Sequence, residues 1–169
     1  DGKTLYFASN RPGGSGGMDI YRVNMDASGR FGTPTNMGKA INTPGDEMFP
    51  YVSSDGKLYF ASDGHPGLGK LDLFVATRKS GKISVDNMGL PFNSSRDDFG
   101  FAIDEVGNMF FSSNRLGGQG DDDIYFYQAP AQPVLATEED PNKPGIGEDK
   151  DKPEGDLKIA NYFLTGVVK

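Results

Sequence analysis

One serine in this chain lies in a pattern typical of a nucleophile. Gly13-Gly14-Ser15-Gly16-Gly17 matches G-x-S-x-G, in which a strand leads directly into a helix and presents the serine at the turn. That chemistry also needs a histidine and an acid brought close to the serine. Here Ser15 lies in a glycine-rich loop between two strand-like segments, so the sequence predicts a flexible turn rather than a nucleophile.

Histidine and cysteine supply too few groups for a metal site or a triad. His65 is the single histidine, and the chain has no cysteine. A zinc centre or a catalytic triad needs several such groups together, so we expect His65 to be a surface loop residue. The absence of cysteine excludes thiolate catalysis, cysteine-bound zinc and disulfides. We therefore predict no catalytic, cofactor-binding or metal-binding residue.

Aspartates are the polar residues that recur most regularly. Asp19, Asp72 and Asp123 each follow a glycine-rich stretch and precede an apolar-aromatic pair. A carboxylate at such a place accepts hydrogen bonds from the backbone N–H groups of the loop and fixes its conformation. The alternative is calcium bound at Asp121-Asp122-Asp123, where oxygen ligands are dense, although the spacing of an EF-hand loop is absent.

Two arginines recur after the same Ser-Asn pair, at Arg11 and Arg115. Each arginine has two interpretations. In the first, it has a structural role, either packing against its own repeat or pairing with a carboxylate of a neighbouring repeat. In the second, it is presented to a partner.

The elements that position these residues belong to a sequence repeated three times. The copies are residues 1–23, 55–76 and 107–127, and phenylalanines 7, 60 and 111 occupy the same place in each. Each phenylalanine precedes its aspartate by twelve residues. The repeat signature consists of Phe7, Asp19, Tyr21, Phe60, Asp72, Phe74, Phe111, Asp123 and Tyr125.

The period and composition of the repeat indicate an all-β fold. Short aromatic segments bounded by Gly, Asp and Pro are typical of strands joined by tight turns. A period of about 50 residues is that of a β-propeller blade with four antiparallel strands. We expect residues 1–128 to form a partial propeller of about two and a half to three blades, whose outer faces leave Tyr6, Tyr59, Phe74 and Phe110 uncovered.

The composition changes after residue 128. Residues 129–156 are rich in proline and charge, which predicts an extended or disordered linker. Residues 157–169 return to an apolar pattern, and we expect them to be the first strand of a following domain. The chain starts within a repeat and reads as a piece of a longer protein.

Its net charge of −7, without a basic stripe, disfavours nucleic acid as a partner.

The longer motifs resemble a known family. The pattern NMG…INTPGDEMFPYVSSDGKLYFAS, followed by NSSRDDFGFAI…FFSSNRLGGQGDDDIYFY, is similar to the TolB-type, WD-like propeller repeat. It resembles in particular the propeller of OmpA-family envelope lipoproteins, including the peptidoglycan-anchoring component of the type IX secretion apparatus. FLTGVVK at the end is similar to the start of the carboxypeptidase-regulatory-like domain that follows the propeller in that family. This resemblance implies that residues 157–169 begin a β-sandwich-like domain.

This resemblance implies a function as well as a fold. It implies a non-catalytic interaction scaffold in the periplasm, associated with the outer membrane, whose partners are other envelope or secretion-system proteins. Peptidoglycan would be bound only through a domain outside this chain. The alternative function is that of a propeller segment in a periplasmic hydrolase or peptidase.

Overall fold

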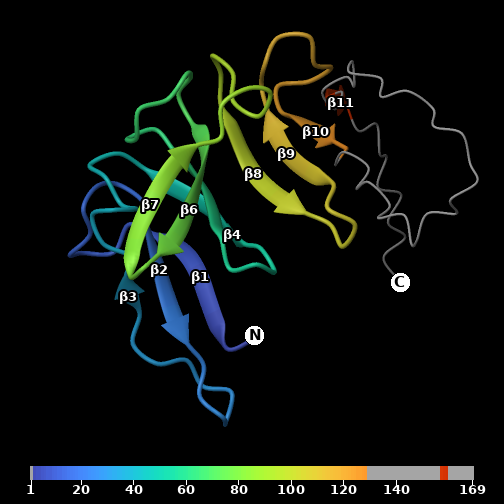
Figure 1. Cartoon of the computed structure of the whole chain (residues 1–169). Helices are drawn as coiled ribbons and strands as arrows, with labels where there is room; N and C mark the ends of the chain where they lie inside the picture. The colour runs from blue at the N-terminus through green and yellow to red at the C-terminus, as the bar shows by residue number, and fades with distance from the viewer. Residues whose placement is uncertain (1, 129–156, 160–169) are drawn as a thin grey trace, which may run out of the picture.

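The chain is all-β in the part that the structure describes. The computed structural model describes residues 2–128, together with the backbone of residues 157–159. These residues form three small antiparallel sheets that follow one another along the chain, and none of them is helical (Figure 1). Accordingly, no described segment is a helix long and apolar enough to cross a membrane.

Each sheet has its strands side by side in chain order. The first sheet contains β1 (Thr4–Ser9), β2 (Asp19–Asn24) and β3 (Thr35–Asn36). The second contains β4 (Glu47–Val52), β5 (Leu58–Ser62), β6 (Asp72–Lys79) and β7 (Lys82–Asn87). The third contains β8 (Asp98–Ile103), β9 (Met109–Ser113), β10 (Asp123–Tyr127) and β11 (Leu157–Ile159).

The repeated residues occupy the same register in every sheet. Phe7 is opposite Tyr21, Phe60 is opposite Phe74 and Phe111 is opposite Tyr125. Each repeated aspartate stands opposite a serine, in the pairs Ser9–Asp19, Ser62–Asp72 and Ser113–Asp123. The interval of twelve residues therefore corresponds to one hairpin whose two strands pair without a shift.

Two apolar clusters hold the sheets together. The first, between sheets one and two, consists of Ile20, Ile41, Leu58, Phe60, Phe74 and Ala76. The second, between sheets two and three, consists of Tyr59, Ala61, Leu73, Phe101, Phe111 and Tyr125. Because side chains alternate between the faces of a strand, β5 and β6 of the middle sheet contribute to both clusters.

The repeated phenylalanines are covered where they belong to one of the two clusters. Phe60 and Phe111 belong to the clusters and are fully buried, whereas Phe7 belongs to neither and is half-buried. The expectation that Tyr59 and Phe74 meet solvent is wrong, since the middle sheet is covered on both faces and they are 8% and 2% exposed. Tyr6 and Phe110, on the other two sheets, are half-buried.

Beyond residue 128 the structure describes only β11. Its backbone pairs antiparallel with β10, with Tyr125 opposite Ile159 and Tyr127 opposite Leu157, so it forms an edge of the third sheet. The predicted linker, residues 129–156, and residues 160–169 lie outside the described residues. The assignment of residues 157–169 to a following domain stays a prediction.

The first strands of sheets two and three carry the same irregularity. The pairing shifts between Met48 and Tyr51 in β4, and between Phe99 and Ala102 in β8. The residues that take up the shift are Phe49, with a φ of 54°, and Gly100, with a φ of 65°. Glycine adopts this left-handed conformation freely, whereas any residue with a Cβ pays about 1–2 kcal/mol for it. Phe49 is strained, and its ring contacts Phe99 at 5.0 Å between centroids.

The strain predicts opposite rankings of glycine and alanine at different strand positions. We expect Phe49→Gly to be more stable to denaturant than Phe49→Ala by about 1 kcal/mol, and Gly100→Ala to cost about 1 kcal/mol. At the exposed strand residue Ser84 of β7, which has no positive φ, alanine should instead be more stable than glycine. A Phe49→Ala variant at least as stable as Phe49→Gly would contradict this account.

Candidate functional site

The long loops of the three sheets gather at one end of the molecule, which we call the loop end. It comprises residues 10–18, 37–46, 63–71, 88–97 and 114–122. Neighbouring loops are joined by backbone hydrogen bonds, among them Gly17 N to Gly45 O (3.1 Å) and Asp63 N to Asp46 O (3.3 Å). Most of the polar residues singled out in the sequence lie here, so the loop end is the candidate functional site.

The three repeated aspartates fix the loops that precede them. Asp19 Oδ2 accepts a hydrogen bond from the backbone N–H of Ser15 at 2.7 Å. Asp72 Oδ2 accepts from Leu68 and Gly69, both at 2.9 Å, and Asp123 Oδ2 accepts from Gln119 and Gly120 at 2.8 and 3.3 Å. These are the contacts expected of a carboxylate that stabilises a loop.

The loops lie so close to these carboxylates that a side chain does not fit. A Cβ built on Gly14, Gly67 or Gly118 would lie 1.8–1.9 Å from Oδ2 of the aspartate five residues later. Glycine is required at these three positions because of close approach, since none of them has a positive φ. One glycine of each loop is thus explained by the aspartate beneath it.

Two buried asparagines act as substitutes for a neighbouring strand. Asn42 accepts from the backbone N–H of Ile20 at 2.8 Å and donates to the carbonyl of the same residue at 3.0 Å. Asn93 does the same to Leu73, at 2.7 and 2.9 Å. Both are at most 1% exposed. Their spacing of 51 residues was a visible signal, but the sequence did not indicate which backbone they bind.

A second set of acids joins each loop to the start of the next sheet. Asp46 accepts from Met18 N–H at 2.6 Å, and Asp97 accepts from Leu71 N–H at 3.1 Å. The residues that follow them donate in return, Glu47 N to Met18 O and Asp98 N to Leu71 O, each at 2.7 Å. Successive sheets are therefore connected by paired backbone contacts as well as by apolar packing.

Glu47 and Asp98 themselves are fully buried acids with different partners. Glu47 accepts hydrogen bonds from Thr43 and from the hydroxyl of Ser62. Asp98 accepts from Ser94 and forms an ion pair with Arg115, with 2.6 Å between Oδ1 and Nη2. A buried carboxylate is tolerated when such partners compensate for lost hydration, and each acid has them.

The two arginines pack on their own sheets. Arg11 lies over the rings of Phe7 and Tyr21, at 5.0 and 4.9 Å from the centroids. Arg115 lies over Phe111 and Tyr125, at 4.9 and 4.8 Å. Of the two interpretations made from sequence, packing therefore holds.

Arg115 also makes polar contacts. Asp98, its ion-pair partner, belongs to the same sheet and not to a neighbouring one. Arg115 donates to the carbonyls of Pro91 and Phe92 at 2.8 and 2.6 Å, and thereby fixes the loop of residues 88–97.

His65 takes the arginine's place in the middle sheet, which corrects the expectation of a surface loop residue. Its ring lies 5.8 Å from Phe60 and 5.1 Å from Phe74, the aromatic pair of that sheet. Its Nε2 is 2.8 Å from the carbonyl oxygen of Ile41, the counterpart of Phe92. The repeat does not show this equivalence, because His65 follows its phenylalanine by five residues and the arginines follow theirs by four. Only the packing reveals it.

The remaining sequence candidates are not brought together. Ser15 and His65 lie in different loops. Ser15 donates its backbone N–H to Asp19, and His65 Nε2 contacts the carbonyl oxygen of Ile41. Among residues 2–128, no group of three or more His, Asp or Glu side chains has the arrangement of a metal site, Asp121–Asp123 included. The geometry shows a loop end in which ionisable groups bind backbone.

Comparisons with family models, with curated proteins and with solved structures found no match to this chain.

The buried ion pair gives a direct test of how the loop end is held. We expect Asp98→Ala to lower the free energy of unfolding by about 3–5 kcal/mol, because Arg115 is left without its buried partner. The exposed pair of Asp26 and Arg30 provides a control, and Arg30→Ala should leave the unfolding midpoint nearly unchanged. Similar losses in both variants, measured by denaturant unfolding, would contradict the assignment.

Two aspartates should respond to pH in opposite ways. Burial, together with the charges of Asp98 and Asp97, raises the pKa of Asp72 above its ordinary value of 3.8 against the effect of its backbone hydrogen bonds. Hydrogen bonds from Lys57 and Ser53 lower the pKa of Asp55 from 3.8 to about 2.

The sign follows from which state binds the proton first. Folded Asp72 is protonated before the unfolded chain as pH falls toward 4, so wild type should gain stability relative to Asp72→Asn. Asp55 contributes stability above pH 4 that is lost between pH 4 and about 2, so wild type should lose stability relative to Asp55→Asn. Denaturant unfolding at pH 7, 5, 4 and 3 measures both differences, and a common direction would refute the analysis.

Proposed function

We propose that residues 2–128 are blades of a β-propeller and that the chain is a non-catalytic protein–protein interaction module of the cell envelope. Support for the propeller comes from the repeat and from the packing of the sheets. The first strand of sheet two, β4, packs against β1 and β2, and the first strand of sheet three, β8, packs against β4, β5 and β6. Consecutive antiparallel sheets packed through their first strands suit a radial arrangement of blades.

The observation that carries the interaction function is a pair of exposed leucines beside a fixed junction. Leu90 is 80% exposed and Leu116 is 84% exposed. They flank the contact between Arg115 and the Pro91 carbonyl, which holds their two loops together at 2.8 Å. Apolar side chains presented on loops that a scaffold fixes are typical of docking surfaces.

The polar groups of the loop end support binding rather than turnover. Asp19, Asp72, Asp98 and Asn93 hold backbone N–H groups or an arginine of their own sheet. Catalysis by general acids or bases instead needs a group aimed at substrate. The loop end therefore presents a fixed surface to a partner.

The cellular setting is proposed from the sequence motifs. Their resemblance to OmpA-family lipoproteins supports a periplasmic, outer-membrane-associated protein, in the manner of the peptidoglycan-anchoring component of type IX secretion. Its partners would be other envelope or secretion-system proteins. Contact with peptidoglycan would require a domain other than the propeller.

Photocrosslinking tests where partners bind. A photoreactive residue placed at Leu90 or Leu116 should form adducts with envelope proteins in the native cell. The same residue at Val106, in the turn between β8 and β9, is equally apolar and 78% exposed but lies outside the loop end. We expect at least several-fold fewer adducts there. Equal yields from all three positions, or none from either leucine, would refute docking at the loop end.

A further inference from the structure

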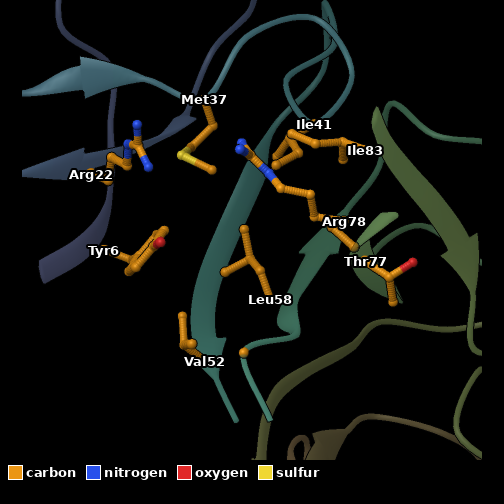
Figure 2. A pocket seen from close by; sticks show the side chains of 11 residues that line it. Tyr6, Arg22, Met37, Ile41, Val52, Leu58, Thr77, Arg78 and Ile83 are labelled. Carbon is orange, nitrogen blue, oxygen red and sulfur yellow. The ribbon is translucent and has the colours of Figure 1, made fainter. Parts of the chain in front are cut away.

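A pocket lies between the first two sheets and reaches the loop end only through Met37 and Ile41. It continues the apolar cluster around Leu58 and Ile41 toward the turns after β4 and β6, and has a volume of about 120 Å³. Its apolar wall comes from both sheets and includes Tyr6, Met37, Ile41, Val52, Leu58 and Ile83 (Figure 2). Arg22 of β2 and Arg78 of β6 also line the pocket.

Three residues between sheets one and two differ from their counterparts one repeat later. Between sheets two and three, Phe101 stacks on Tyr59 at 4.5 Å and contacts Phe92 at 6.0 Å. Between sheets one and two, the smaller Pro50 and Ile41 stand at the places of Phe101 and Phe92, and the ring of Tyr6, the counterpart of Tyr59, is left without that stack. Arg22 stands where the later repeat has Val75. A pocket lined in part by Tyr59, Ile103, Gly107 and Met109, the counterparts of Tyr6, Val52, Gly56 and Leu58, lies at the same place between sheets two and three. The first gap is therefore distinguished by its lining, above all by Arg22, and not by being open.

Two unpaired positive charges border the pocket between sheets one and two. Figure 2 shows the guanidinium groups of Arg22 and Arg78 turned toward Met37 from either side. Among the described residues neither arginine makes an ion pair or a side-chain hydrogen bond, although the chain as a whole carries a net charge of −7. Both are exposed, so an incoming anion reaches them without displacing a carboxylate.

We propose that this pocket binds the C-terminal residue of a partner polypeptide, with an aliphatic side chain against Leu58 and Met37 and the α-carboxylate between Arg22 and Arg78. The inference rests on the proposed interaction function and names a class of partner for it. Arginine recognises carboxylates through paired, charge-assisted hydrogen bonds.

The size of the pocket favours this occupant. A volume of about 120 Å³ is well below the roughly 300–1,000 Å³ of pockets that enclose whole small molecules. One aliphatic side chain suits it. A C-terminal residue carries its side chain and its carboxylate on the same Cα, so the anion lies at the mouth when the side chain is inserted. An internal segment has no α-carboxylate, so it would need an acidic side chain at the mouth in addition to the aliphatic side chain in the pocket.

The test uses small probes with the full chain in solution. N-acetyl-L-leucine should shift the methyl NMR signals of Met37 and Leu58 in a saturable manner, with a dissociation constant of about 1 mM. N-acetyl-L-leucinamide, which lacks the carboxylate, and N-acetylglycine, which lacks the side chain, should each bind at least about tenfold more weakly. Equal binding of acid and amide, or shifts elsewhere in the chain, would overturn the proposal.

Variants separate the pocket from general charge effects. Arg22→Gln and Arg78→Gln should each weaken N-acetyl-L-leucine about tenfold, whereas Arg96→Gln, another exposed arginine away from the pocket, should not. Ile41→Phe introduces the residue found at position 92 and should abolish binding by filling the pocket. Unchanged affinity in both arginine variants would overturn the proposal even if Ile41→Phe fails to fold.

The two functional proposals fail separately. Crosslinks from Leu90 and Leu116 without carboxylate binding would overturn the pocket assignment and leave the interaction function in place. Saturable binding by the pocket without loop-end crosslinks would refute docking at the loop end and leave the pocket assignment in place.

Discussion

The fold depends on satisfying backbone groups in loops that are too irregular to pair with one another as strands. Burying an unpaired N–H or C=O costs about 1–3 kcal/mol. The loop end contains many backbone groups that would be unpaired without a side-chain partner. Asn42 and Asn93 each bind both polar groups of one strand residue, and Asp19, Asp72 and Asp123 receive loop N–H groups. Because the aspartates, and the strand residues that the asparagines bind, belong to the sheets, these contacts fix the loops to the sheets.

Equivalent positions of the repeats have the same structural role even where their residue types differ. Arg11, His65 and Arg115 all cover the aromatic pair of their sheet, although one is an imidazole and stands at a shifted position. Glu47 and Asp98 both accept from the loop before them, but only Asp98 has an arginine to pair with. What recurs is a planar or cationic group over two rings and an acceptor beneath a loop.

The sequence was sufficient for the regular part of this structure. A fixed interval between a phenylalanine and an aspartate predicts an in-register hairpin, and the all-β character follows from the repeat. Burial was harder to predict, because it depends on which sheet has neighbours, and Tyr59 and Phe74 were therefore placed wrongly in solvent. The role of His65 and the targets of the asparagines depend on contacts across 20 or more residues, which spacing alone does not reveal.

Departures from the repeat are the most informative positions for function. A residue that matches its counterparts is explained by the fold that all copies share, whereas a mismatch needs a local reason. Ile41 and Arg22 both line the pocket between sheets one and two, and they stand where the next repeat has Phe92 and Val75. The smaller side chain of Ile41 gives up packing contacts that a phenylalanine would make between these sheets. A ligand that fills the pocket would restore that packing and neutralise Arg22 and Arg78 at the same time.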